Sequence, residues 1–228
     1  MAAGLIVLAR LDSRRLPGKA LLDLGDRPLL GRVFDRLRHT PRRPPIFLAT
    51  SDRPVDDPLA AFAAEEGVAC FRGSAEDVMA RTAACAEAHG LDRFARVCGD
   101  SPFIPADQIG ALLALHAALD LDVATNVAPR SFPPGASVEI VKTAALRRAL
   151  GDADLTAEDR EHVTAHLYRH PDRCSIYNLA ACGDRYAGVR LTVDTAAELA
   201  LARAITARLA DPAAADLDAV VAAYRASR

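Results

Sequence analysis

The sequence predicts an α/β fold in which a mixed, mostly parallel sheet is covered by helices on both faces. Short apolar runs alternate with segments whose apolar residues recur at helical spacing, from the first residues to about residue 126. The connections between them are short, which favours parallel strand–helix–strand units. The chain has 228 residues, 51% of them hydrophobic, and a chain of this size can bury roughly 70% of its unfolded surface. We therefore expect one domain, residues 1–228, with a smaller α+β insertion.

The first half supplies most of the predicted sheet. The predicted strands are residues 4–9, 45–49, 68–71, 94–98 and 122–125. The first is a short, continuous apolar run, as in a sheet covered on both faces. The helices predicted between them are residues 28–39, 55–66, 74–89 and 105–119. Pro28 suits a first helical turn, Ser74 stands near an expected N-cap, and Gly67 and Gly90 suit helix ends.

The second half is less regular. A turn-rich loop at 129–135 precedes a predicted strand at 137–141, and Thr156 is expected to cap a helix at 156–168. Two further strands are predicted at 174–179 and 189–193. Thr195 and Glu198 have the spacing of a capping box, which predicts the start of a long helix rich in Ala and Leu.

Charge, hydropathy and cysteine content exclude several classes of protein. The net charge of −2 argues against a nucleic-acid partner bound by bulk electrostatics. The longest apolar run near the N-terminus, residues 5–9, is too short for a membrane span or a signal sequence. The five cysteines are odd in number and form no C-x-x-C pair, so a disulfide framework is not expected. We expect a cytoplasmic protein with no membrane partner.

The loop after the first strand, residues 10–19, has the composition of a phosphate-binding loop. It carries four cations, a hydroxyl and a glycine: Arg10, Arg14, Arg15, Lys19, Ser13 and Gly18. Polyphosphates require fixed cations, backbone N–H groups and a small residue that permits close approach. The loop has neither the P-loop pattern nor G-x-G-x-x-G. A solvated basic loop over a helix end is the alternative.

Two aspartates follow predicted strands far apart in the sequence. Asp100 follows the strand at 94–98, and Asp194 follows the one predicted at 189–193. Because each stands at the carboxyl end of an apolar run, the two side chains could share a crevice and form a sparse Mg²⁺ site completed by substrate phosphates and water. Taken singly, each aspartate could instead be a turn or capping residue.

Three segments resemble the CMP-sugar synthetases, which include the 3-deoxy-manno-octulosonate and acylneuraminate cytidylyltransferases. A-R-x-x-S-x-R-L-P-G-K at 9–19 resembles their signature loop, most closely that of the relatives involved in spore-coat polysaccharide synthesis. G-D-x-P at 99–102 and V-D-T-x-x-E-L at 193–199 resemble their two metal-binding segments. The resemblance spans roughly residues 3–210 and implies a Rossmann-like, three-layer nucleotide-diphospho-sugar transferase fold (GT-A-like). Its expected parts are a nucleotide-binding part (1–126), an acceptor and dimerisation insertion (127–190), and a metal-site strand end with C-terminal helices (191–228).

The resemblance also assigns roles to residues. The catalytic residues it implies are Arg15, Lys19, Asp100 and Asp194, with Asp100 and Asp194 holding Mg²⁺. The nucleotide-binding residues it implies are Ala9, Arg10, Ser13, Arg15, Lys19, Arg72, Ser74 and Gly99; Arg72 and Ser74 belong to an F-R-G-S-x-x-D-V segment expected beside the base. The chain departs from the family at Asp12, where a small residue is usual, and this places negative charge beside a triphosphate.

Two later segments resemble the family's acceptor-binding region. The acceptor-binding residues implied are Asn126, Arg130, Glu139, Glu161 and His162. Ser137 stands where the family has an aspartate, which puts the usual acceptor in doubt. His162, His166 and His170 recur every four residues, so a zinc site formed by His162, His166 and Glu161 is a further alternative.

The function implied is a CTP-dependent cytidylyltransferase that transfers CMP to an acidic sugar, such as a sialic-acid-like nonulosonate or an octulosonate, and releases pyrophosphate. CTP and an acidic small molecule are the expected partners, and a homodimer is consistent with the resemblance. Ser137 motivates a phosphonate or sugar phosphate as the alternative acceptor. A metal-dependent glycosyltransferase would require a D-x-D motif, for which 120–122 and 152–154 are the candidates. A non-catalytic nucleotide sensor is the third alternative.

Overall fold

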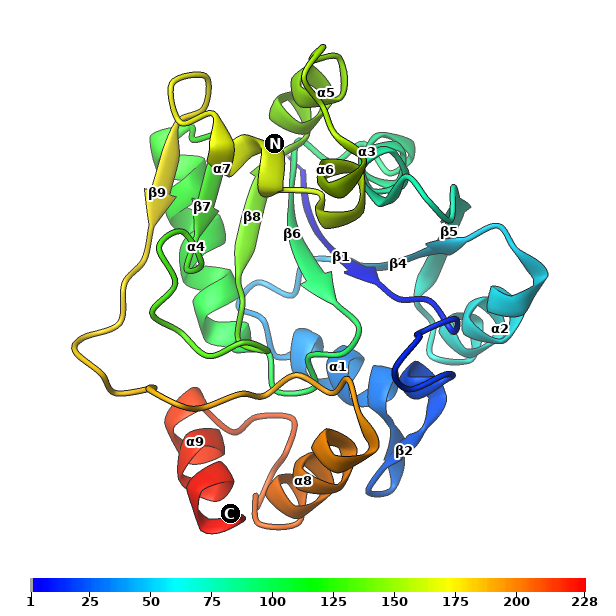
Figure 1. The fold of residues 1–228 in the computed structure, drawn as a ribbon, viewed down its shortest axis with the longest axis vertical. Helices are drawn as coiled ribbons and strands as arrows, with labels where there is room; N and C mark the ends of the chain where they lie inside the picture. Colours follow the sequence, from blue (N-terminus) through cyan, green and yellow to red (C-terminus); the bar gives the residue numbers. More distant parts are fainter. Residues whose placement is uncertain (1) are drawn as a thin grey trace.

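A seven-stranded sheet forms the centre of the molecule in the computed structural model, which describes residues 2–228 (Figure 1). Its strand order is β5-β4-β1-β6-β8-β7-β9. The strands are β1 (Ala3–Leu8), β4 (Ile46–Ser51), β5 (Ala69–Gly73), β6 (Arg93–Cys98), β7 (Val123–Thr125), β8 (Glu139–Lys142) and β9 (Ile176–Asn178). The first four strands of this order are parallel, whereas β8 is antiparallel to both of its neighbours. The prediction of a mixed, mostly parallel sheet is confirmed.

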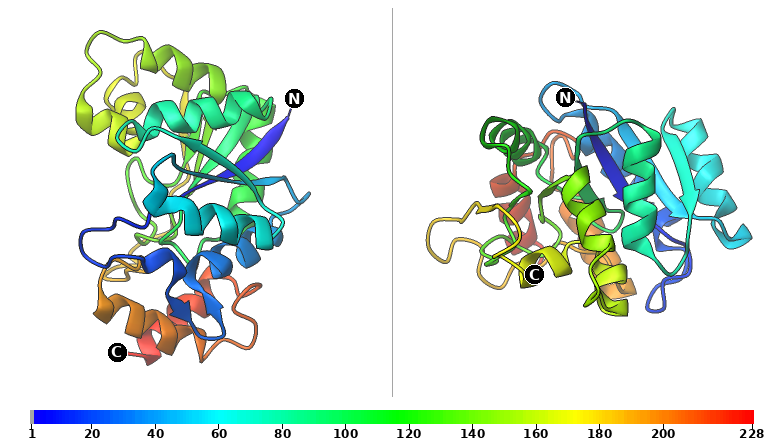
Figure 2. Two further views of the ribbon diagram at one scale, coloured as in Figure 1. Left: turned by 90° about the vertical axis from the view of Figure 1, so that its right-hand side faces the viewer. Right: turned by 90° about the horizontal axis from the view of Figure 1, so that it is seen from above.

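Helices pack on both faces of the sheet, as Figure 2 shows. Alternation along β1 explains why: Leu5 and Val7 belong to one buried cluster, and Ile6 to the other. The larger cluster takes in α1 (Leu29–Arg38), α2 (Asp57–Glu65), α4 (Ala106–Leu119), α8 (Ala196–Thr206) and α9 (Leu217–Ala226). The opposite layer contains α3 (Val78–Ala88), α5 (Thr143–Leu150), α6 (Ala157–His162) and α7 (Ala165–Arg169). Smaller elements are the helices η1 (Lys19–Leu21) and η2 (Pro54–Asp56) and the hairpin of β2 (Asp23–Leu24) and β3 (Arg27–Pro28).

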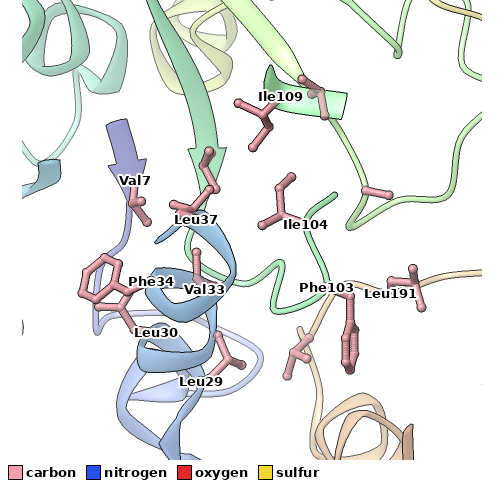
Figure 3. Packing of buried hydrophobic residues seen from close by; sticks show 14 of the residues in the cluster. Val7, Leu29, Leu30, Val33, Phe34, Leu37, Phe103, Ile104, Ile109 and Leu191 are labelled. Atoms are coloured by element: carbon pink, nitrogen blue, oxygen red, sulfur yellow. The ribbon is translucent and has the colours of Figure 1, made fainter. Parts of the chain in front are cut away.

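Helix α1 anchors the larger core. Its apolar residues recur at helical spacing, and Leu30, Val33 and Phe34 are fully buried (Figure 3). Each such side chain contributes roughly 1.5–3 kcal/mol by leaving water. On the same helix, buried Arg36 donates to the carbonyls of Ile104 (2.8 Å), Pro212 (2.8 Å) and Ala215 (2.7 Å). Burial lowers the pKa of Arg36 to about 10, and the three hydrogen bonds tie the C-terminal segment to the core.

The strand predicted at 189–193 does not form. Instead, the connection from β9 to α8 crosses below β6 and β8 in Figure 1. Leu191 N–H donates to the carbonyl of Pro134 (2.7 Å), and Val193 N–H donates to that of Asp100 (3.0 Å). The apolar residues of this segment are buried because two loops cover them, and not because the segment joins the sheet.

Helix boundaries bring three more corrections. The helix predicted at 156–168 is broken at Val163, whose φ of 63° divides it into α6 and α7. Helix α3 begins at Val78 with Asp77 as its N-cap, because the Asp77 carboxylate accepts from Ala80 N–H (2.8 Å). Helix α5 was not predicted, whereas α8 and α9 are the C-terminal helices expected within 191–228. None of the helices formed by residues 2–228 is both long and apolar enough to cross a lipid bilayer.

Candidate active site

The first loop leaves the carboxyl end of β1 and is held in place by a buried aspartate. Asp56 accepts a hydrogen bond from Leu11 N–H (2.7 Å) and another from the Ser51 hydroxyl at the end of β4. Gly18 adopts φ 71°, a conformation that favours glycine, and its N–H closes the loop on the Leu11 carbonyl (2.8 Å). The neighbouring strand therefore fixes where the cations of this loop lie.

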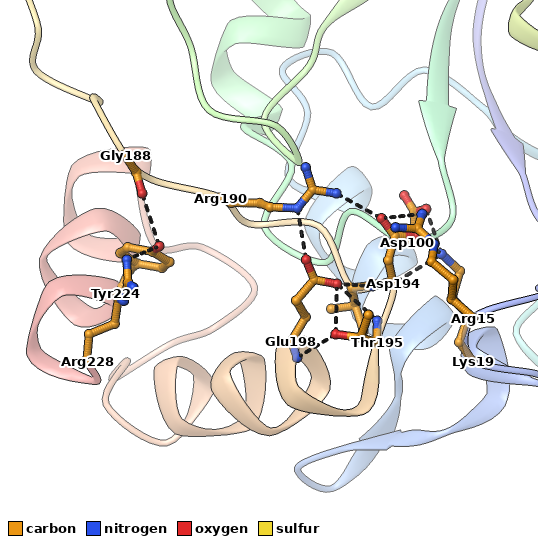
Figure 4. Close-up of polar contacts among 11 residues, drawn as sticks. Arg15, Lys19, Asp100, Gly188, Arg190, Asp194, Thr195, Glu198, Tyr224 and Arg228 are labelled. Atoms are coloured by element: carbon orange, nitrogen blue, oxygen red, sulfur yellow. Dashed lines mark hydrogen bonds and ion pairs between the residues drawn. The ribbon is translucent and has the colours of Figure 1, made fainter.

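Lys19 is the centre of the site (Figure 4). Its ammonium donates to Asp100 Oδ2 (2.8 Å), to Asp194 Oδ1 (2.8 Å) and to the Val193 carbonyl (2.9 Å). Burial on its own lowers the pKa of Lys19, but the charges and hydrogen bonds of the two aspartates outweigh it and raise the pKa above its usual value. Burial also opposes ionisation of Asp194, yet Lys19 and the nearby arginines hold the pKa of that carboxyl below its usual value. Three charged side chains from three distant segments thus meet at one point.

Two arginines complete the surroundings of Asp194. Arg15 from the first loop and Arg190 from the β9–α8 connection each lie 3.0 Å from Asp194 Oδ2. Arg190 also donates to Glu198 Oε1 (2.9 Å), and Glu198 Oε2 accepts from the N–H groups of Asp194 (2.8 Å) and Thr195 (3.0 Å). The predicted capping box is therefore present, and it orients Asp194 at the start of α8. Arg190 was not among the residues predicted from the sequence. Its position four residues before Asp194 could have indicated an ion pair with that carboxylate.

The two carboxylates have the composition of a magnesium site. Asp100 and Asp194 each approach the same ammonium to 2.8 Å, so a divalent cation at that position could reach both. Carboxylate pairs with remaining positions for water and phosphate oxygens suit Mg²⁺. The convergence expected from the sequence is observed, whereas the binding of Mg²⁺ stays a prediction.

A cavity of about 540 Å³ opens over the first loop; we call it the loop cavity. Predicted residues that line it are Ala9, Arg10, Ser13, Arg15, Lys19, Gly99, Asp100, Glu161, His162 and Asp194, together with Asp12 and Arg14. A Cβ at Gly99 would lie 2.9 Å from the Ala9 Cβ and 3.1 Å from the Leu8 carbonyl, so this wall requires glycine. Asp12 bonds to Arg53, and this hydrogen bond holds the pKa of Asp12 below its usual value. The negative charge introduced by Asp12 therefore has a cationic partner.

A second cavity, of about 430 Å³, adjoins the first; we call it the insertion cavity. The residues that matter for its chemistry are Arg96, Arg130, Ser137, Glu139, Tyr168 and Arg190. Asp100 and His162 line both cavities. A ligand in either cavity can therefore approach Asp100, which is the arrangement that a reaction between two substrates requires.

A buried polar cluster forms one wall of the insertion cavity. Glu139 accepts from Arg96 (2.6 Å), from the Thr164 hydroxyl (2.6 Å) and from the Tyr168 hydroxyl (2.7 Å). Burial alone would raise the pKa of Glu139, but the Arg96 charge and these hydrogen bonds hold it below its usual value. Burial and the Glu139 charge raise the pKa of Tyr168 well above its usual value. The wall is thus rigid and keeps its ion pair at neutral pH.

Three residues expected at the site lie outside both cavities. Arg72 donates to the carbonyls of Ser51 (3.0 Å) and Arg53 (2.8 Å), and Ser74 Oγ accepts from Asp77 N–H (3.0 Å). Asn126 is fully buried, and its amide joins the two sides of the 126–138 loop by bonds to Ala136 and Val138. In this structure these side chains shape the loops that carry the site.

The zinc site weighed from the histidine spacing is not formed by the expected residues. The break at Val163 separates His162, which lines both cavities, from His166. His166 is buried, and its Nε2 lies 2.8 Å from Asp152 Oδ2. The regular helix on which the spacing argument depended does not exist here.

Together, the mostly parallel sheet, the cationic loop after β1 and the paired carboxylates of Asp100, after β6, and Asp194, before α8, define a nucleotidyltransferase. A sequence profile of the family described as Cytidylyltransferase matches residues 5–206. The chain belongs to the cytidylyltransferase family and is a CTP-dependent nucleotidyltransferase.

One relative and two solved structures are similar to the chain. The chain is 32% identical to the spore coat polysaccharide biosynthesis protein SpsF of Bacillus subtilis over 196 residues, which is 83% of this chain and 80% of SpsF. Its fold is similar to that of a cytidylyltransferase from Leptospira borgpetersenii, with a TM-score of 0.92, 24% identity, and coverage of 99% of this chain and 95% of the other. It is also similar to CMP:2-keto-3-deoxy-manno-octonic acid synthetase complexed with CTP, with a TM-score of 0.67, 22% identity, and coverage of 91% and 99%. The fold expected from the sequence is confirmed.

Proposed function

We propose that this enzyme transfers CMP from CTP to an acidic sugar and releases pyrophosphate. The observation that carries the proposal is the contact of two cavities at Asp100, one lined by the cationic first loop and the other by arginines of the insertion. CTP would occupy the loop cavity and the acceptor the insertion cavity. The names of SpsF and of the CMP:2-keto-3-deoxy-manno-octonic acid synthetase support a sugar acceptor.

The reaction is a displacement at phosphorus, in which an acceptor oxygen attacks the α-phosphorus of CTP. The bond between the α-phosphorus and the oxygen that bridges to the β-phosphate breaks. Pyrophosphate leaves with the electron pair of that bond. Arg15 and Lys19 lie where they can neutralise the charge that develops on the leaving group. His162, which lines both cavities, stands near their junction and would accept the proton that the acceptor hydroxyl loses.

Mg²⁺ held by Asp100 and Asp194 belongs to the same proposal. When bound, the ion supplies Lewis-acid stabilisation of the phosphate oxygens. Lys19 donates to both carboxylates, so its ammonium has to leave them when a cation takes that position. The triphosphate provides its next partner, since Lys19 also lines the loop cavity.

A phosphonate or sugar phosphate is the second candidate acceptor, and Arg130 favours it. Its guanidinium donates to the Ser137 hydroxyl (3.0 Å) and forms no ion pair with any residue between 2 and 228. Ser137 replaces the aspartate of the related acceptor segment, so the cavity has one positive charge more to offer an anion. A dianionic phosphonate would make fuller use of Arg130 and Arg190 than a carboxylate.

A glycosyltransferase and a nucleotide sensor find less support. The D-x-D candidates lie outside both cavities: Asp120 and Asp122 pair with Lys142 and Arg148, and Asp152 pairs with His166. A nucleotide sensor would bind CTP without turnover, and pyrophosphate release distinguishes it from an enzyme.

A thermal-shift panel of CTP, UTP, ATP and GTP, each with and without Mg²⁺, tests the nucleotide and the metal. At about one hundred times Kd, a ligand stabilises by roughly 2.7 kcal/mol, which raises Tm by about 5–10 °C for a chain of this size. A Mg²⁺-dependent shift for CTP alone is expected. Pyrophosphate release with a panel of sugar acids, sugar phosphates and phosphonates then identifies the acceptor, because only phosphonate and phosphate acceptors give a P–O–P product. If none of the four nucleotides raises the Tm, the proposal is contradicted.

A further inference from the structure

A cluster of histidines and aspartates lies on α7 and on the loop that precedes α6. One nitrogen each from His166 and His170 and one carboxylate oxygen of Asp154 lie within 4.8 Å of one another. His170 Nε2 is 3.2 Å from Asp154 Oδ2, and His166 Nε2 is 4.0 Å from Asp154 Oδ1. Asp152 adds a fourth candidate ligand atom, its Oδ2, which lies 2.8 Å from His166 Nε2. None of these four residues lines the two cavities of the active site.

We propose that Asp152, Asp154, His166 and His170 form a structural zinc site that is separate from the reaction centre. Imidazole nitrogens with carboxylate oxygens are a ligand set that suits Zn²⁺. Tetrahedral zinc with bonds of about 2.0–2.2 Å sets its ligand atoms roughly 3.3 Å apart. The observed separations of 2.8, 3.2 and 4.0 Å lie around that value, so side-chain adjustments would bring the four ligand atoms around a common ion.

The surroundings also suit a bound cation. The His166 side chain is 1% exposed, which fixes the orientation of its ring. Its Nδ1 lies 3.7 Å from Asp159 Oδ2, so a small movement would give the hydrogen bond to a carboxylate that orients a metal-bound histidine. Arg169 now contacts both of these groups, and it is half-exposed, so it can move aside.

Asp154 and His170, rather than the buried His166, give the cluster its access to solvent. Asp154 is 50% exposed, and His170 is 20% exposed, so an ion can enter between them. Arg173 lies 3.6 Å from both Asp152 and Asp154, too far for hydrogen bonds, which leaves carboxylate oxygens available. A bound ion would coordinate Asp152 and Asp154 directly, in place of their weak attraction to the exposed guanidinium of Arg173.

Zinc at this position would link the loop before α6 to α7. Helix α7 carries Tyr168, whose hydroxyl bonds to Glu139 in the wall of the insertion cavity. The break at Val163 leaves α7 only five residues long, which is too short to be stable without tertiary contacts. The metal would therefore fix the helix that supports the acceptor wall.

The test is a competition titration of the metal-free full chain with ZnCl₂ against a chromophoric zinc chelator, in millimolar MgCl₂ to occupy the aspartates of the active site. We expect one zinc per chain, and an affinity lowered about tenfold or more by His170→Ala or Asp154→Asn. His39→Ala, which removes an exposed histidine at the end of α1, is the control and should leave affinity unchanged. Because Asp154 is half-exposed, Asp154→Asn should fold even if His170→Ala does not.

A second readout is the stability of the wild-type chain. Zinc at about one hundred times Kd should raise its Tm by about 5–10 °C, and this rise should disappear in Asp154→Asn. X-ray absorption of the zinc form should show two imidazoles and oxygen ligands. The proposal is wrong if the wild type retains no zinc in MgCl₂, or if His170→Ala and Asp154→Asn bind it as tightly as His39→Ala. Neither outcome bears on CTP binding, which the nucleotide panel measures separately.

Discussion

Replacement of Asp100 by asparagine separates the chemistry of this carboxylate from its contribution to the fold. Asp100 is 25% exposed, and its Oδ2 accepts from Lys19 at 2.8 Å. Asparagine keeps the shape and one acceptor oxygen, and Lys19 keeps its bonds to Asp194 and to the Val193 carbonyl. A partly exposed ion pair contributes about 0–1 kcal/mol. We therefore expect the Tm to fall by no more than about 2–4 °C.

The effect on catalysis should be much larger. If Asp100 holds Mg²⁺ against the triphosphate, losing its charge should lower kcat about a thousandfold or more, which corresponds to about 4 kcal/mol of the activation barrier. The barrier would thus change by about four times as much as the free energy of unfolding. Pyrophosphate release in Mg²⁺ measures the change in kcat. Calorimetry of CTP binding with and without Mg²⁺ measures how far the variant has lost its affinity for the metal.

Asp35 on α1 provides a matched control. It is 24% exposed and pairs with Arg27 (3.1 Å) and Arg38 (2.9 Å), but it lines neither cavity. Asp35→Asn should change the Tm by a similar amount and leave kcat unaltered. The assignment of Asp100 fails if Asp100→Asn stays within about tenfold of wild-type activity in Mg²⁺, or if Asp35→Asn loses as much activity.

Three further predictions concern the acceptor wall and the core. Arg130→Ala should raise the acceptor KM about tenfold or more without changing the Kd of CTP, since a charge-assisted hydrogen bond is worth about 1.5–3 kcal/mol. If steady-state kinetics give the same acceptor KM for the wild type and the variant, Arg130 does not belong to the acceptor site. Glu139→Gln should lower the free energy of unfolding, measured in urea, by about 3–5 kcal/mol because it leaves the charge of Arg96, whose side chain is only 16% exposed, without its ion-pair partner. The pKa of Glu139 in the folded state lies below its usual 4.5, so its contribution to stability is complete above pH 4.5 and is lost as the pH falls through the folded-state pKa. The wild type should therefore lose stability more steeply in acid than Glu139→Gln. Parallel curves of unfolding free energy against pH for the two proteins would contradict this. Arg36→Met should lower the free energy of unfolding by about 3 kcal/mol or more because three carbonyls lose their donor, whereas exposed Arg38→Met should change it by less than about 1 kcal/mol.

Local patterns predicted the nucleotide half of the molecule well because its strands and helices are regular. The strands β1, β4 and β6 are short and rich in apolar residues, and they are buried on both faces. The same pattern failed at 189–193, because an apolar run records burial and not hydrogen bonding to a neighbouring strand. That segment is covered by loops whose position depends on the whole fold.

The candidate site was predictable where one loop carries several functional residues. Arg15 and Lys19 lie close in the sequence, and Asp100 and Asp194 each follow an apolar run. The pairing of Arg96 with Glu139 was not predictable, because it depends on the antiparallel register of β6 and β8, which no local pattern specifies. The break at Val163 was equally hidden, since a buried β-branched residue is not expected at positive φ.

The sequence separations at Lys19 have a consequence for synthesis of the chain on the ribosome. Lys19 meets Asp100 across 81 residues and Asp194 across 175. A nascent chain therefore exposes its basic loop long before the last aspartate has emerged, and during that interval Lys19 lacks one of the two carboxylates that it contacts in the folded protein. The same separation means that a proteolytic fragment that ends before Asp194 can keep the whole β1–β6 unit and still lack the second carboxylate that Lys19 contacts.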